Sequence, residues 1–89
     1  MPFVYILRCS DGSLYTGIAK DLERRLQQHQ LGTASKYTRS HLPVTLVWKR
    51  RVLTWSRALQ EELRIKALSR AEKEALVIAP PRVRVRRKA

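Results

Sequence analysis

The chain has 89 residues, and 44% of them are hydrophobic, which is enough for one folded domain but not for two cores. Nineteen Lys and Arg oppose seven Asp and Glu, so the formal net charge is +12. The single cysteine excludes an internal disulfide and a site built on several thiolates. This excess of positive charge indicates a polyanionic partner, and it favours nucleic acid over an anionic membrane.

The N-terminal sequence begins almost directly with a strand pattern, without a basic stretch followed by a long apolar run. No run of about 18 apolar residues occurs anywhere in the chain. We therefore expect no signal peptide, no membrane contact and a cytoplasmic location.

An N-terminal hairpin is predicted by an apolar stretch rich in β-formers, the turn signal Ser-Asp-Gly-Ser at 10–13, and a returning strand. Each strand carries a tyrosine, Tyr5 in the first and Tyr15 in the second. A two-residue loop would pair Arg8 with Tyr15 and put the tyrosines on opposite faces, whereas a three-residue loop would put them on the same face. The hairpin pattern alone leaves both registers open.

The first helix is predicted to run from the N-cap Asp21 to Leu31, because Gly32 is a natural stop. Arg25 and His29 lie one turn apart, on a strip beside the apolar stripe of this helix. Arg25 could bind a phosphate oxygen in bidentate fashion. A lone arginine on a helix flank is more often a surface residue, and a lone histidine more often a structural one.

Residues 33–43 are predicted to be a polar loop, and residues 44–51 a strand with strict alternation. That alternation predicts one face formed by Val44, Leu46 and Trp48, and another formed by Thr45, Val47 and Lys49.

The second helix is predicted from residue 54 to residue 68. Its apolar arc is expected to comprise Trp55, Ala58, Leu59, Leu63 and Ile65. Glu62 falls inside this arc, where a carboxylate needs a cation, a metal or hydrogen bonds. An ion pair with Lys66 and a functional role for Glu62 are equally compatible with the pattern. Glu61 is expected to be a solvated surface charge.

Ser69 and Glu72 form a capping box that opens a short third helix, which is expected to end before Pro80. The order strand-strand-helix-strand-helix-helix predicts an α+β fold in which a small three-stranded, mainly antiparallel sheet is flanked by helices. The folded domain is expected to span residues 1–79. We expect residues 80–89 to be a mobile basic tail after two prolines, rather than an edge strand.

The chain resembles the GIY-YIG nuclease superfamily, and in particular its small stand-alone bacterial members. The resemblance covers residues 2–77, and it is carried in order by Val4-Tyr5-Ile6, Tyr15-Thr16-Gly17, Arg25, His29 and Glu62. Val4 stands where the family pattern has glycine, and Thr16 where it has isoleucine. Neither of these side chains takes part in the chemistry, so the substitutions are compatible with membership.

The resemblance implies a GIY-YIG-like fold and metal-dependent hydrolysis of nucleic-acid phosphodiesters. Glu62 would hold one divalent cation, Mg²⁺ with Mn²⁺ as a substitute. Tyr5 and Tyr15 would form an active-site pair, with one of them acting as general base or water-positioner. This implication favours the three-residue hairpin loop.

Three further residues take roles by the same resemblance. Arg25 would stabilise the scissile phosphate, and His29 would support the tyrosine network. Gly17 would allow close backbone approach beside the site. A tyrosine with an ordinary pKa of about 10 is a poor base at neutral pH, so neighbouring charges must lower that pKa or the tyrosine only orients a water.

We expect DNA rather than RNA as substrate, with structure-directed cleavage in repair or recombination. The nucleic-acid contacts are expected from Lys20, Arg24, Lys36, Arg39, Arg50, Arg51 and Lys66. Two alternatives remain: a binding module without turnover, and a subunit whose protein partner supplies substrate recognition. The chain is expected to be a monomer or a weak dimer.

Overall fold

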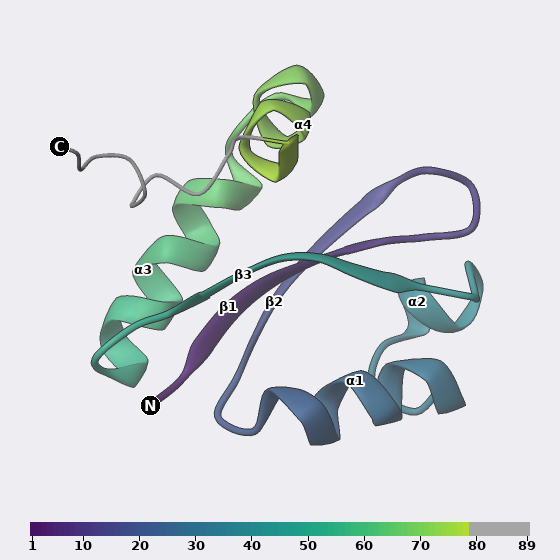
Figure 1. The fold of residues 1–89 in the computed structure, drawn as a ribbon, viewed down its shortest axis with the longest axis horizontal. Helices are drawn as coiled ribbons and strands as arrows, with labels where there is room; N and C mark the ends of the chain where they lie inside the picture. The colour runs from purple at the N-terminus through teal and green to yellow at the C-terminus, as the bar shows by residue number, and fades with distance from the viewer. Residues whose placement is uncertain (79–89) are drawn as a thin grey trace, which may run out of the picture.

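The computed structural model describes residues 1–78, so the predicted basic tail and its boundary lie outside the described residues. The elements appear in Figure 1 in the order β1 (Phe3–Arg8), β2 (Leu14–Ala19), α1 (Leu22–Leu31), α2 (Lys36–Arg39), β3 (Thr45–Arg51), α3 (Trp55–Lys66) and α4 (Arg70–Ile78). Within this part of the chain, no helix is long and apolar enough to cross a lipid bilayer.

The three strands form one antiparallel sheet in the order β2-β1-β3, which confirms the predicted α+β fold. Helices α1 and α2 lie on one side of the sheet, and α3 and α4 lie on the other (Figure 1). The central strand β1 therefore faces helices on both sides. Its alternating side chains supply the centre of two hydrophobic cores, one on each face of the sheet, so the expectation of a single core was wrong although the chain is one domain.

The core on the α1 side contains Tyr5, Leu7, Cys9, Ala19, Leu22 and Val44. The core on the α3 side contains Val4, Ile6, Ala58 and Ile65. Because successive residues of β1 point to opposite faces, the Tyr5 ring belongs to the α1 side of the sheet.

The hairpin has the three-residue loop. The backbone N–H of Cys9 donates to the carbonyl of Ser13 at 2.8 Å, which leaves residues 10–12 as the loop. Gly12 has φ +87°, a left-handed conformation that glycine adopts without strain. Consequently Tyr5 and Tyr15 lie on the same face of the sheet, the register that brings both phenols to one site.

The prediction of strict alternation in β3 was wrong beyond Leu46. Leu7 pairs with Leu46 whereas its neighbour Ile6 pairs with Trp48, so the register shifts by one residue. The extra residue is Val47, and it forms a β-bulge. Trp48 therefore packs with the core on the α3 side instead of sharing a face with Leu46.

The predicted apolar arc of α3 was also wrong in part. Leu59 is 43% exposed and Leu63 is 69% exposed, although both had been assigned to the buried side. Ala58 and Ile65 are the fully buried positions, and the two residues between them on that stripe are Glu61 and Glu62. The helix thus presents an i, i+3, i+4, i+7 stripe with two carboxylates at its centre.

The predicted loop 33–43 contains the short helix α2. Ser35 is its N-cap, and its Oγ accepts hydrogen bonds from the backbone N–H groups of Tyr37 and Thr38. A single turn of helix is too short to produce a periodic apolar pattern, which is why the sequence did not reveal it. By contrast, the predicted capping box of Ser69 and Glu72 is present at the start of α4.

Candidate active site

A buried chain of hydrogen bonds links β1, α1 and α2. The Oη of Tyr5 lies 2.8 Å from Nε2 of His29, and Nδ1 of His29 lies 2.9 Å from Oγ1 of Thr38. Exposure is 2% for Tyr5, 1% for His29 and 0% for Thr38, so water does not compete for these bonds. The predicted contact between His29 and the tyrosines is therefore a direct one.

Tyr15 meets the same imidazole from another side. Its ring lies edge-on to His29 with the ring centroids 5.3 Å apart, and Tyr5 is edge-on to His29 at 5.7 Å. The outer face of Tyr15 stacks on Tyr37 of α2, with centroids 6.1 Å apart. His29 is thus enclosed by both strand tyrosines, in geometries that aromatic rings favour.

Gly17 makes room for this arrangement. Gly17 lies opposite Tyr5 in the sheet, and the Tyr5 phenol lies where a side chain on residue 17 would be. A Cβ atom on Gly17 would lie 2.6 Å from Oη and 2.7 Å from Cζ of Tyr5, and 3.2 Å from Cε2 of Tyr15. The close approach that the resemblance implied at this glycine is therefore made by the two phenol rings.

Two charged residues from opposite sides of the sheet act on the Tyr5 phenol. Its pKa is raised above the ordinary value, mainly by burial and then by Tyr15; the cation Arg25 on α1 opposes this rise, and the carboxylate Glu62 on α3 adds to it. Arg25 does lower the pKa of Tyr5, but burial outweighs it, so among protein groups alone the net pKa is raised.

The pKa of His29 is lowered, first by burial and then by the positive charge of Arg25. Its imidazole is therefore neutral at neutral pH. A neutral imidazole has one nitrogen that donates and one that accepts, so His29 can accept a proton from a hydrogen-bonded phenol.

Glu62 lies at the edge of the sheet-facing stripe of α3, with 18% of its side chain exposed. Its Oε2 lies 3.3 Å from Nζ of Lys66, so the ion pair considered from the sequence is present. Its neighbour Glu61 was expected to be solvated. That expectation was wrong, because Glu61 is only 20% exposed and pairs with Arg64 at 2.8 Å and with Arg50 at 3.7 Å.

The donor set suits one hard cation and not a cage of protein ligands. Within residues 1–78, no three His, Cys, Asp or Glu side chains gather in a way that could hold a metal ion. Mg²⁺ commonly takes one or two carboxylates and completes its shell with waters and phosphate oxygens. Glu62, with 18% of its side chain exposed, could supply one such carboxylate from the sheet-facing stripe of α3.

A groove of about 330 Å³ adjoins Arg25. It is lined by Ala19, Lys20, Asp21, Arg24, Arg25, Gln28 and Trp55. The ammonium of Lys20 lies 5.7 Å from the centre of the Trp55 ring, which is 41% exposed. Three cations and an exposed indole thus line one groove, a combination that suits a nucleic-acid strand.

The other predicted nucleic-acid contacts are spread over the molecule. Lys36 and Arg39 lie on α2, next to the tyrosine pair, whereas Arg50 and Arg51 lie on β3 at the opposite edge of the sheet from β2. Lys66 is paired with Glu62. The structure therefore brings Lys20 and Arg24 to the groove beside Arg25 and leaves Arg50 and Arg51 apart from it.

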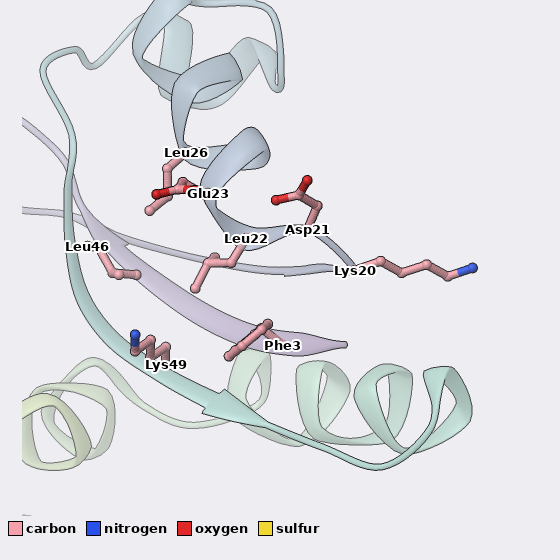
Figure 2. Close-up of a pocket in the computed structure, with 8 residues that line it drawn as sticks. All are labelled: Phe3, Lys20, Asp21, Leu22, Glu23, Leu26, Leu46 and Lys49. Carbon is pink, nitrogen blue, oxygen red and sulfur yellow. The ribbon is translucent and has the colours of Figure 1, made fainter. Parts of the chain in front are cut away.

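A wider groove of about 590 Å³ lies on the other side of α1. Figure 2 shows Leu22 and Leu26 of α1 above Phe3 and Leu46 of the sheet, with Lys20 extending away from them. Its lining contains none of the five predicted catalytic residues. The predicted catalytic residues therefore lie outside this groove, although it is larger than the one beside Arg25.

Sequence reasoning missed three residues around the site. Thr38 and Tyr37 were assigned to a loop, and Trp55 was assigned to the buried arc of its helix. The Ser35 N-cap two residues before Tyr37 was the available signal for α2. For Trp55, the only sequence signal for an exposed side chain was its place in the first turn of the helix, where helical periodicity predicts burial least well.

Comparisons with known proteins show the family of this chain. The family model described as the GIY-YIG catalytic domain matches residues 1–75. UPF0213 proteins of Halobacterium salinarum and Oceanobacillus iheyensis are each 49% identical, over 85% and 84% of this chain and 99% and 87% of their own lengths. The solution NMR structure of the UPF0213 protein BH0048 from Bacillus halodurans is 44% identical with a TM-score of 0.57, covering 86% of this chain and 83% of that one.

The chain belongs to the GIY-YIG family, a nuclease superfamily whose members bind nucleic acid and generally use divalent metals. Within the family its relatives are the small UPF0213 proteins.

Proposed function

We propose that this protein is an endonuclease that hydrolyses phosphodiester bonds in nucleic acid, with one Mg²⁺, or Mn²⁺ in its place, held by Glu62. The observation that carries the proposal is the buried chain of hydrogen bonds in which the Tyr5 hydroxyl lies 2.8 Å from Nε2 of His29, together with the groove lined by Arg25 and two further cations. The residues proposed to act come from two helices on opposite sides of the sheet and from its central strand.

The raised pKa of Tyr5 decides how it takes part. A free phenolate is not available at neutral pH, so Tyr5 cannot act by losing its proton beforehand. Instead, its Oη takes a proton from the attacking water while its own proton passes to Nε2 of neutral His29. The water oxygen forms the new bond to phosphorus, the bond to the leaving oxygen breaks, and that oxygen takes a proton from solvent. His29 later returns its proton to solvent.

Arg25 and Glu62 have the two remaining roles, which are to bind the phosphate and to hold the metal ion. Arg25 lines the groove and donates to a phosphate oxygen, which offsets the charge that builds up during attack. A cation bound at Glu62 would act as a Lewis acid on the phosphate. Tyr15 packs against His29 and holds the imidazole in line with the Tyr5 hydroxyl.

The substrate part of the proposal rests on charge. DNA of branched or other non-duplex structure, as arises in repair and recombination, would follow the groove along Lys20 and Arg24, with its bases near Trp55. The remaining predicted cations would add affinity without sequence choice. Action in the cytoplasm, as a monomer or weak dimer and with a protein partner that selects the substrate, belongs to the same proposal.

The test is cleavage by the purified full chain with Mg²⁺ or Mn²⁺, on end-labelled single-stranded, duplex and branched DNA and RNA. Glu62→Gln is expected to lower the rate at least a hundredfold while changing the binding affinity less than about threefold. Glu61→Gln is the matched control, because it removes the neighbouring half-buried carboxylate from the same helix and should keep cleavage. Binding without cleavage on every substrate would instead support a binding module.

A further inference from the structure

The hydrogens of the buried chain can be placed from its geometry. The hydroxyl of Thr38 donates its single hydrogen to the carbonyl oxygen of Ser35, 3.3 Å away. Its Oγ1 therefore meets Nδ1 of His29 as an acceptor, and Nδ1 carries a hydrogen. Nε2 of His29 is then bare and accepts the hydrogen of the Tyr5 hydroxyl.

The opposite tautomer leaves a group unsatisfied. With the hydrogen on Nε2, that nitrogen would donate to the Tyr5 oxygen, and Thr38 would donate to Nδ1. The hydroxyl hydrogen of Tyr5 would then have no acceptor, since within residues 1–78 its oxygen has no hydrogen-bond partner other than His29. A buried donor without an acceptor costs about 1–3 kcal/mol. The tautomer with hydrogen on Nδ1 satisfies all three groups.

Helix α2 holds Thr38 in position. Its N-cap residue Ser35 accepts from the backbone N–H of Tyr37 at 3.1 Å and from that of Thr38 at 3.4 Å. Tyr37 fixes the same turn to the hairpin, because its ring stacks on Tyr15 and its hydroxyl donates to Ser13 Oγ at 2.5 Å. The position of the Thr38 hydroxyl is thus set independently of its bond to His29.

We propose that Thr38 is a positioning residue that keeps the hydrogen of His29 on Nδ1, so that Nε2 stays available for the proton of Tyr5. Removal of the hydroxyl would leave one buried donor without an acceptor in either tautomer, Nδ1–H in one and the Tyr5 hydroxyl in the other, so the preference for Nδ1–H would be lost. In the molecules with the hydrogen on Nε2, that nitrogen donates to Tyr5 and cannot receive its proton. The role in catalysis rests on the proposed function, whereas the choice of tautomer does not.

The tautomer can be read without any cleavage assay, from the ¹⁵N shifts of the imidazole nitrogens in histidine-labelled protein. A His41→Gln variant removes the other histidine and so identifies the His29 signals. In the unaltered protein at neutral pH, we expect a protonated Nδ1 and a bare Nε2. In Thr38→Val, which keeps the shape of the side chain, we expect that preference to be lost, so that Nδ1 and Nε2 are each protonated in part of the molecules. Thr38→Ser restores the hydroxyl and should restore the Nδ1–H tautomer.

The cleavage rate gives the second readout. Thr38→Val is expected to lower kcat by about tenfold with little change in KM, since only the molecules with a bare Nε2 can take the proton of Tyr5 and the imidazole has lost a positioning bond. Thr38→Ser should stay within about threefold of the unaltered protein. Thr33→Val is the matched control. It removes the hydroxyl of an exposed threonine in the segment between α1 and α2, and it should keep the cleavage rate.

Two results would overturn the proposal: a bare Nδ1 in the unaltered protein, or Thr38→Val that keeps both the Nδ1–H tautomer and the full rate. If Thr38→Val does not fold, the tautomers of the unaltered protein and of Thr38→Ser still test the proposal, because both proteins must carry the hydrogen of His29 on Nδ1. An unaltered protein with the expected tautomer but without cleavage on any substrate would reject the proposed function and keep the assignment of Thr38 as the acceptor.

Discussion

At the scale of single residues, the site needs Gly17 as much as it needs its tyrosines and His29, because the missing side chain of Gly17 leaves room for the Tyr5 phenol. Gly17 does not have a positive φ, so its backbone conformation does not require glycine. Position 17 requires glycine because the Tyr5 phenol occupies the space where a side chain would be. The Tyr5 phenol that fills this space is buried and hydrogen-bonded to His29, so it cannot simply swing away. A methyl group at position 17 would therefore act on the chemistry through Tyr5.

We expect Gly17→Ala to lower the cleavage rate at least tenfold and the stability by about 1–3 kcal/mol, because the phenol must leave its place beside His29. The measurements are urea unfolding and cleavage under one set of conditions. Gly12→Ala is the control: at φ +87° it costs about 1 kcal/mol through backbone strain, and its nearest neighbouring atom would be 3.9 Å away. Equal loss of cleavage in both variants would contradict a specific role for Gly17.

The residue pattern located the main chemical groups before any coordinates. Tyr5, Tyr15 and His29 were expected to interact, and they do so around one imidazole. Thr38 could not be found in this way. A threonine in a polar loop sequence shows no pattern that distinguishes it from its neighbours. Its partner His29 lies nine residues earlier, on another helix.

At the scale of elements, sequence periodicity predicted every strand and the three longer helices but not all of their faces. Alternation along β3 assumes an unbroken register, and the bulge at Val47 turned Trp48 to the other side of the sheet. In α3, the apolar residues Leu59 and Leu63 suggested a buried face that in fact carries Glu62 at its edge. Glu61 and Glu62 occupy partly buried positions because each is ion-paired, and a hydrophobic pattern alone does not reveal such pairs.

Helix α4 is attached to the hairpin by a charged group. The carboxylate of Glu74 accepts from Arg8 of β1 at 2.7 and 3.0 Å and from Arg70 at 3.2 Å. These bonds, first that of Arg8, lower the pKa of Glu74 to about 2 from an ordinary 4.5. Because the folded pKa lies below the unfolded one, this stabilisation is complete above pH 4.5 and is lost as the pH falls toward 2.

Glu74→Gln should accordingly lower the melting temperature by a constant amount between pH 5 and pH 7. The difference from the unaltered protein should shrink as the pH falls from about 4.5 to about 2. Glu23→Gln, which removes one carboxylate from an exposed position of α1, serves as the control for net charge. A difference that does not vary with pH would mean that the Arg8–Glu74 pair does not hold α4 in place.

At the scale of the whole molecule, the sheet separates two helical layers, and the predicted site residues come from both. Arg25 comes from the α1 layer and Glu62 from the α3 layer. Arg25 lines one groove with Lys20 and Arg24, whereas Arg50 lies on β3 and pairs with Glu61. On the proposed function, the net charge of +12 would attract nucleic acid in general, and the groove cations would set how a strand lies against Arg25.

Two double variants with equal charge loss separate these contributions. Lys20→Gln with Arg24→Gln removes two groove cations, and Arg50→Gln with Arg51→Gln removes two from the far edge of the sheet. Each phosphate contact contributes about 0.7–0.9 to the slope of log K against log salt, so the groove variant should lower that slope by about 1.4–1.8. The far-edge variant should lower it less, because Arg50 is already paired. Fluorescence anisotropy on one labelled oligonucleotide, from 50 to 200 mM salt, measures both slopes; equal reductions would mean that the nucleic acid spans both edges of the sheet.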